Sequence, residues 1–471
     1  MDVVSMSDLH INGELQQIKV ISDEHSAFGG WFTAAMAAFA LRDTEISISH
    51  ATCKDFTLSH GSLTLQADVL LALQDVGITE QVLIEQASAT PFLANQYIGW
   101  GNNAHSSLAG LAKSGVPLNG VGFVHYLTRL RNETHDSQWN IEAFSLNTMC
   151  AAHNTFTRPS ADPRSILSSL EYGLRVNAKS LCALLKQVAV THGKVLELCS
   201  SNLESNNKDS ASVVTLDCRL CVSVDSSDSL PIDSIKIVGH APKEASLSNV
   251  LECLDNGYVE RQYLQSNCYS RWFSSSGIES GEVLVESESN NDSRQISIAP
   301  LASDTWHSDS STIYLFETGV HQLLDDGGLG YRTQQLASLW PLLSGARLSD
   351  TAAKYFCRLS AQRYKYWRDI AVLPMYLCNK DNTAFWQSAK SQLVNDDLSY
   401  LVNFYIDTGV LPQLEHYPED LGSLENTLLA FEHYPRNADP LSYVWDLSEL
   451  VSRLDKLRQQ IKQTAVQLPQ I

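Results

Sequence analysis

The residues with the clearest chemical meaning near the start of the chain belong to the stretch EHSAFGG, which follows a short apolar run at 18–22. In dinucleotide-binding folds, a glycine-rich turn between a strand and a helix lets the backbone approach a pyrophosphate closely. The three glycine positions are best matched by His25, Ala27 and Gly30, and only the last is glycine. The turn is either an adapted phosphate loop or a strand–helix turn that holds nothing, and we favour the second interpretation.

Two histidines could add polar chemistry. His50 ends the next apolar alternation, EISISH, where dinucleotide-binding folds usually carry an acidic residue that accepts from a ribose hydroxyl. A neutral imidazole also accepts a hydrogen bond, so this replacement weakens such a site without abolishing it. His60 invites a general-base hypothesis, but a lone loop histidine is more often a surface or packing residue.

Other groups of reactive side chains give little indication of a metal or catalytic site. Cys218 and Cys221 form a CxxC, but no second pair completes a zinc site, so the cysteines are interpreted as mostly buried small hydrophobic residues. Asp325 and Asp326 precede glycines and are interpreted as a helix end rather than a metal site. The sequence has no G-x-S-x-G, no H-E-x-x-H and no P-loop, and we predict no metal site.

Hydrophobic spacing predicts the elements that position these residues. A strand at 18–22, a helix at 31–41 and a strand ending at His50 form a βαβ unit. Helices are predicted at 66–88 and 164–193, and short alternations at 194–286 predict a β-rich region. After about Asp325 the pattern is helical, with an interruption at Pro374 and a last amphipathic helix before Pro469.

The charge balance narrows the range of partners. The chain of 471 residues carries 33 basic and 53 acidic residues, a net charge of -20. Such a surface repels phosphate backbones and anionic lipid, so nucleic-acid and membrane partners are not expected. The N-terminus lacks the pattern of a signal peptide, and the longest apolar stretch, WFTAAMAAFAL, is too short to span a bilayer. The cytoplasm is the expected compartment.

Six stretches in sequence order resemble the flavin-dependent tryptophan halogenase family. They are Gly30-Trp31 with the alanine-rich helix, Ala89-Thr90 through Gly99-Trp100-Gly101, RPSADPRSILSSLEYGLRVNAKSLCALLKQ, LFETGVHQL, YKYWRDIAVLPMYLCNKDNTAFW, and HYPRNADPLSYVWDLSELVSRLDKLRQQIKQTAVQLP. The match spans nearly the whole chain after Ile18. The chain is therefore identified as a divergent member of that family.

The resemblance implies an α/β fold, with a Rossmann-like FAD/NAD(P)-binding flavoprotein box, a mixed sheet and a helical C-terminal region. We expect an N-terminal extension at 1–17, the box with inserted substrate-side helices at 18–350, and helices packed on it at 351–471. The implied cofactor is FAD. In the family, reduced flavin and oxygen generate hypohalous acid, which travels through a tunnel to a lysine beside the aromatic substrate, and a glutamate assists. The positions that match the flavin site are Gly29, Gly30, Trp31, His50, Thr318 and Gly319.

The sequence departs from the family where the chemistry occurs. Phe92 occupies the lysine position, Phe316 the glutamate position and Glu317 the neighbouring serine. Trp272 alone represents the family's W-x-W-x-I-P motif. We therefore assign no catalytic residue, expect weak or lost FAD binding, and predict an impaired protein that does not halogenate.

Two alternatives remain open at this point. The chain could be an active FAD-dependent halogenase or monooxygenase on an indole-type aromatic substrate, with Glu317 and a lysine from elsewhere rebuilding the site. It could instead be a non-catalytic partner of an active relative. The expected partners are an aromatic small molecule and, by family analogy, a second subunit in a homodimer or a heterodimer with a related halogenase.

Overall fold

The structure, a computed structural model, places most of the chain in three sheets and a helical layer. It describes residues 15–23, 26–52, 60–101, 106–136, 139–193, 195–199, 213–219, 234–240, 246–265, 267–274, 293–295, 307–309, 312–315, 323–343, 349–380, 383–393, 395–415, 417 and 421–471. Among these residues, no helix combines the length and the apolar character that crossing a bilayer requires.

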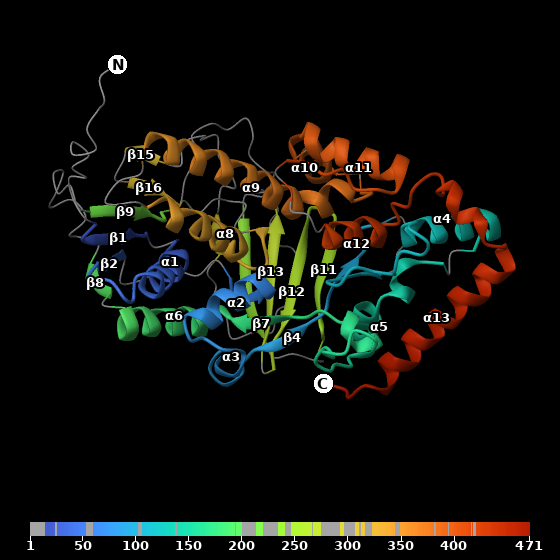
Figure 1. Cartoon of the computed structure of the whole chain (residues 1–471), viewed down its shortest axis with the longest axis horizontal. Coiled ribbons are helices and arrows are strands. Elements are labelled where there is room, and N and C mark those ends of the chain that lie inside the picture. Colours follow the sequence, from blue (N-terminus) through green and yellow to red (C-terminus); the bar gives the residue numbers. More distant parts are fainter. Residues whose placement is uncertain are drawn as a thin grey trace, which may run out of the picture.

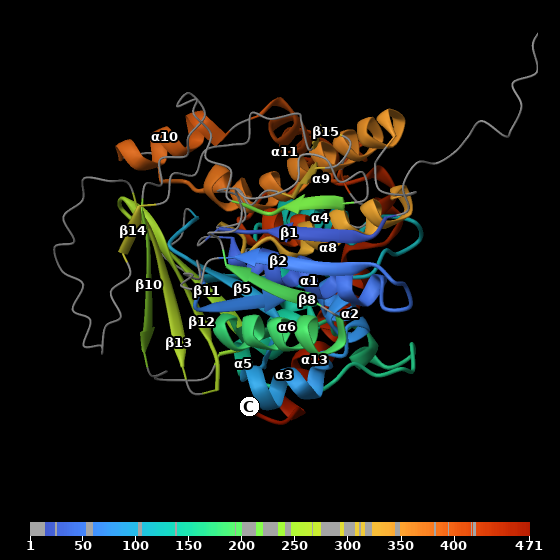
Figure 2. The ribbon, with the colours of Figure 1, turned by 90° about the vertical axis from the view of Figure 1, so that its left-hand side faces the viewer.

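The N-terminal βαβ unit belongs to a six-stranded sheet. Its strands, in spatial order, are β15 (His307–Asp309), β16 (Thr312–Tyr314), β9 (Val213–Asp217), β1 (Gln17–Ile21), β2 (Ser47–Thr52) and β8 (Val195–Cys199). β1 lies parallel to both β2 and β9. Helix α1 (Ala27–Ala40) connects β1 to β2, which confirms the predicted strand–helix–strand unit, and it packs against α6 (Ala178–Gly193) (Figure 2).

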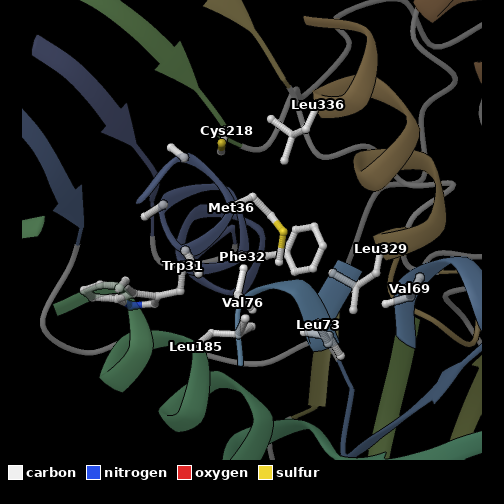
Figure 3. Close-up of a cluster of buried hydrophobic side chains, with 14 of the residues drawn as sticks. Trp31, Phe32, Met36, Val69, Leu73, Val76, Leu185, Cys218, Leu329 and Leu336 are labelled. Atoms are coloured by element: carbon white, nitrogen blue, oxygen red, sulfur yellow. The ribbon is translucent and has the colours of Figure 1, made fainter. Parts of the chain in front are cut away.

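Helix α1 is apolar on every side because it is enclosed on every side. Trp31 points toward α6, and Phe32 and Met36 lie on the side of α2 (Ala67–Asp75) and α8 (Leu329–Leu339) (Figure 3). All three side chains belong to the largest hydrophobic core. An apolar surface all round is typical of a fully buried helix.

A second sheet, of seven strands, stands beside the first (Figure 2). Its spatial order is β14 (Ser293–Gln295), β10 (Ser234–His240), β13 (Cys268–Ser274), β12 (Gly257–Tyr263), β11 (Ser248–Leu254), β5 (Ala94–Ile98) and β6 (Ser106–Gly110). Its pairs are antiparallel except β11 with β5, so the sheet is mixed. The third sheet is antiparallel, with the order β3 (Ser62–Leu65), β7 (Gly173–Asn177) and β4 (Thr90–Phe92).

The C-terminal part is helical, as predicted. It contains the long α9 (Asp350–Leu377), then α10 (Ala384–Leu393), α11 (Asp396–Thr408), α12 (Gly422–Ala430) and α13 (Leu447–Gln467). The earlier part of the chain also contains the helices α3 (Glu80–Ala87), α4 (Phe123–Thr134) and α5 (Leu146–His153). Helices α9 to α12 lie along one side of the sheets, whereas α13 runs across the end of the molecule toward α5 (Figure 1). Helix α9 continues through Pro374 for about one more turn rather than stopping there.

Two predicted helices need correction. The helix predicted at 164–193 begins only at Ala178, because the residues before it form strand β7. Gly173 explains part of this: a β-carbon there would lie 2.6 Å from the carbonyl oxygen of Leu65 on β3, so the backbones meet closely. The helix predicted at 66–88 is two helices, α2 and α3, separated by a turn in which Gly77 has a φ of +89°.

The close contact between α1 and the end of β1 gives the first prediction. A β-carbon at Gly30 would lie 2.7 Å from the β-carbon of Ser22 and 2.6 Å from Nε2 of His50, both buried. Gly30→Ala should therefore lower the free energy of unfolding by about 1–3 kcal/mol through overpacking, even though alanine is the better helix former. Denaturant unfolding measures this change.

Gly101→Ala is the control, since a β-carbon there meets no atom of the described residues within 4 Å. If Gly30→Ala is as stable as the unchanged protein, or more stable, the close contact between α1 and the end of β1 is contradicted.

Candidate functional site

His50 lies at the carboxyl end of β2 and is fully buried. Its Nε2 shares a hydrogen bond of 2.8 Å with the hydroxyl of Ser22, which follows β1. The Trp31 ring meets the imidazole edge to face at 4.3 Å. Burial, and to a lesser extent the charge of Lys186, lowers the pKa of His50 to about 3, so the ring is neutral at physiological pH. The side chain predicted to accept from a ribose is thus enclosed within the fold.

The turn before α1 is held by its own side chains. Ser26 donates its backbone N–H and its hydroxyl to the carboxylate of Asp23, at 2.9 and 2.8 Å. Ala27, at the second glycine position of the phosphate loop, is buried in the first turn of the helix. Gly30 packs on Ser22 and His50, and Gly29 is also buried in α1. His25 lies outside the described residues.

Phe92, at the family's lysine position, ends strand β4 and is fully buried. It lies opposite Gly173 of β7 in the strand register, and its ring is one of the nearest groups to that glycine. The position therefore holds an apolar ring in a close-packed part of the interior.

A buried cation does lie near Phe92, but it is engaged with the backbone. The guanidinium of Arg175, on β7, donates to the carbonyl oxygens of Pro91 and Ser248 at 3.1 and 3.0 Å, and to that of Ser246. Its Nε has no hydrogen-bond partner among the described residues. Burial lowers the pKa of Arg175 to about 9. These bonds join β7 to the start of β11.

Several predicted site residues lie outside the described part of the chain. They are Phe316, Glu317, Thr318 and Gly319 of the LFETGVH stretch, and Cys221 of the CxxC pair. Trp272 lies on β13 and is partly exposed, whereas Cys218 is buried with its thiol 3.5 Å from the hydroxyl of Thr33. No cluster of three metal-ligating side chains occurs among the residues that the structure describes.

A cavity that the sequence did not predict lies between the second sheet and the helices α9 and α12. It has a volume of about 150 Å³. Aromatic side chains from β5 and the turn after it, from β12 and from α9 form much of its wall, and carboxyl groups line it near the turn before α8. The aromatic residues are Tyr97, Trp100, Tyr258, Tyr366 and Trp367.

The acidic side of this cavity is a hydrogen-bonded network. Glu260, on β12, forms a buried ion pair with Arg271 on β13 and accepts from Gln262 at 2.8 Å. The Asp325 carboxylate accepts from the side-chain amide of Asn249 at 3.1 Å. Loss of solvent, followed by the charges of Glu260 and Asp326, raises the pKa of Asp325 to about 8. Asp325 is therefore largely protonated at neutral pH.

The neighbouring residues hold the Asp325 turn in place. Asp326 accepts from the backbone N–H groups of Gly328 and Gly330, both at 2.7 Å, at the start of α8. His60 is buried, and its Nε2 lies 2.9 Å from the carbonyl oxygen of Leu324. These contacts support the interpretation of the aspartate pair as a helix end and of His60 as a packing residue.

One pattern could have pointed to this network. Glu260, Gln262 and Arg271 are polar residues at buried positions of strands β12 and β13, and buried charges are paired or functional. Their meeting with Asp325, more than 50 residues later, depends on the tertiary fold. A second cavity, of about 280 Å³, is lined by residues that include Lys113 and Glu425.

Burial of His50 predicts a loss of stability in acid. The unfolded chain takes up a proton near pH 6.5, whereas folded His50 resists protonation down to about pH 3. The contribution of His50 to the free energy of unfolding is therefore complete above pH 6.5. It falls by about 1.4 kcal/mol for each unit that the pH drops below this value. His50→Asn should make the free energy of unfolding less dependent on pH between 7 and 4.5, by about 2–3 kcal/mol. His135→Asn, at an exposed histidine, is the control. If the free energy of unfolding depends on pH in the same way in His50→Asn and in the unchanged protein, His50 is not buried in its neutral form.

Comparison with known proteins agrees with these observations. Residues 27–226 match the family model for tryptophan halogenase, whereas no curated protein sequence matches the chain. BrvH, a flavin-dependent halogenase from Brevundimonas sp. BAL3, shares the fold with a TM-score of 0.82 and 17% identity over 97% of each chain. Xcc4156, a flavin-dependent halogenase from Xanthomonas campestris, gives 0.80 and 16% over 97% of each chain. The tryptophan 6-halogenase SttH from Streptomyces toxytricini gives 0.79 and 14% over 97% of this chain and 98% of its own. Residues 27–226 thus resemble the tryptophan halogenase family, and the chain as a whole shares the fold of flavin-dependent halogenases.

Proposed function

We propose that this protein does not halogenate, that it binds flavin weakly or not at all, and that it has kept the fold as a binding site for a small aromatic molecule. Phe92 carries this proposal, because the position of the family's lysine is a buried apolar ring. Regioselective halogenation requires a donor that holds hypohalous acid beside one carbon of the substrate. A phenyl ring has no such donor.

The size of the expected loss follows from electrostatic catalysis. Removal of one preorganised polar group typically lowers the rate by about a hundredfold to a thousandfold, on the order of 3–4 kcal/mol. Arg175 does not replace the lysine, because its guanidinium is hydrogen-bonded to three backbone carbonyl groups. We therefore expect no detectable halide-dependent product.

The flavin side of the proposal rests on the end of β2 and the turn before α1. A ribose would need an exposed acceptor, but His50 is enclosed between Ser22 and Trp31. A pyrophosphate would need glycine at the second loop position, but Ala27 buries its side chain there. The described residues thus do not fit a flavin dinucleotide in the usual manner of the fold.

The retained binding role rests on the cavity beneath α9. Small-molecule sites are concave, mostly apolar and fitted with a few polar groups that orient the ligand. The cavity has this composition, with aromatic rings on β5, β12 and α9 and polar groups near Asp325. An aromatic ligand is therefore the best match.

The direct test is an absorbance titration of the purified protein with oxidised and reduced FAD, followed by assay with a flavin reductase, halide and tryptophan or indole. We expect a free-flavin spectrum and no halogenated product by mass spectrometry. BrvH, itself a flavin-dependent halogenase, is the positive control. A yellow protein that binds FAD at low-micromolar affinity, or a halide-dependent product, would refute the proposal.

Restoring the lysine alone should not restore activity. Phe92→Lys places an ammonium group in a fully buried site, so we expect several kcal/mol of destabilisation and still no halogenated product. Phe92→Leu is the matched control for lost ring volume and should be milder. Thermal unfolding and the mass-spectrometric assay on both variants give the two readouts.

A second candidate function, active halogenation through a relocated lysine, is favoured by one observation. Lys113 lines the cavity of about 280 Å³ and follows β6, which borders the cavity beneath α9. If a halogenated product does form, Lys113→Met should abolish it while leaving flavin binding unchanged. Product without any dependence on Lys113 would rule out this route.

A further inference from the structure

We propose that the cavity beneath α9 binds a small organic cation, an arylalkylammonium ion, in preference to neutral or anionic aromatic molecules. This inference rests on the proposed function, because it takes the cavity as the binding site and names the class of its ligand. Its basis is the joint presence of aromatic rings and carboxyl groups around one cavity, with a buried acceptor on Asn249, which is hydrogen-bonded to the Asp325 carboxyl group of the lining.

The cavity has room for an aryl ring, and its walls are aromatic. Its volume of about 150 Å³ is comparable to that of a protein cavity that accommodates benzene. Trp100 and Tyr258 lie 5.3 Å apart, centroid to centroid, so their rings form one continuous wall. Tyr97 and Trp367 also contribute to the lining. Cations are attracted to the faces of such rings within about 6 Å.

The charge of the lining has one sign. Glu260, Asp325 and Asp326 belong to the cavity wall, and no lysine, arginine or histidine is among its described lining residues. Arg271 lies behind Glu260 and compensates that one carboxylate. Asp326 is engaged with the backbone of Gly328 and Gly330, which leaves Asp325 as the carboxyl group available to a ligand.

A separate observation indicates a missing hydrogen-bond donor. The side chain of Asn249 is fully buried, and its amide nitrogen donates to Thr64 and to Asp325. Its carbonyl oxygen has no partner among the residues described. A buried acceptor without a donor is unfavourable, and Asn249 meets the cavity lining through its hydrogen bond to Asp325, so a donor beside that carboxyl group would be stabilised. An ammonium group supplies up to three donors.

Binding of a cation should also change the protonation of Asp325. The groups that act on this carboxyl are Glu260, Asp326, Arg271 and the hydroxyl of Thr64, and the balance among them with burial raises its pKa to about 8. A cation beside it favours the ionised form, so binding releases a proton. Affinity should therefore rise with pH, by up to about tenfold per unit below pH 8.

The experiment compares three probes that share a phenyl ring and a two-carbon chain: 2-phenylethylamine, 2-phenylethanol and 3-phenylpropanoate. Each is titrated by calorimetry into the full chain without flavin, at pH 6 and pH 7.5, in two buffers with different heats of ionisation. We expect the amine to bind at least about tenfold more tightly than the alcohol, which is the change expected from one charge-assisted hydrogen bond of roughly 1.5 kcal/mol. The propanoate should not bind detectably, and the buffers should reveal proton release with the amine alone.

Variants separate the carboxyl group from the shape of the cavity. Asp325→Asn keeps the size of the side chain and an acceptor for Asn249, so it should remove the preference for the amine and the proton release while leaving the affinity for the alcohol unchanged. Glu415→Gln, at an exposed carboxylate away from the cavity, is the control.

The inference fails if the amine and the alcohol bind equally, if the propanoate binds best, or if Asp325→Asn changes nothing. The proposed function fails by different measurements, namely if the protein binds FAD or forms a halogenated product. The two failures are therefore distinguishable. If none of the three probes binds while the protein also proves flavin-free and inactive, the cation inference is refuted and the absence of halogenation stands.

Discussion

The structure depends on the close approach of α1 to the end of the parallel sheet. Gly30 allows this approach because it has no β-carbon between the helix and the Ser22–His50 pair. Burial of Trp31, Phe32 and Met36 then unites the sheet with α2, α6 and α8 in one core. The contact that builds the fold is also the contact that encloses His50. Ser22 and His50, at the ends of β1 and β2, are thus engaged in the packing of the fold itself.

Several carboxyl groups are buried beneath helix α9. Carboxyl groups are costly to bury, and the protein meets the cost in three ways: an ion pair at Glu260, backbone hydrogen bonds at Asp326, and a raised pKa at Asp325. The aromatic rings around them lower the local polarity and strengthen each of these effects.

Periodicity and turn chemistry predicted the βαβ unit, the β-rich middle and the helical end, since these patterns are local in sequence. Phe92 could be assigned from a short segment anchored by Gly99 and Trp100. Strand β7 was missed because its apolar alternation runs directly into helix α6 without a breaker. The cavity was missed for a different reason: Asn249, Glu260 and Asp325 meet only through tertiary packing, and no local pattern encodes such a meeting. The part of the candidate site around residues 316–319 remains a prediction.

Arg175 has a consequence for how the chain folds during synthesis. Strand β7 pairs with β3 and β4, all of which leave the ribosome early, but its guanidinium needs the carbonyl oxygens of Ser246 and Ser248. Those acceptors are made about seventy residues later. Until they are made, Arg175 has only one of its three backbone acceptors, the carbonyl oxygen of Pro91. The hydrogen bonds of Arg175 are therefore complete only when the chain has reached the start of β11, beyond residue 226 where the family match ends.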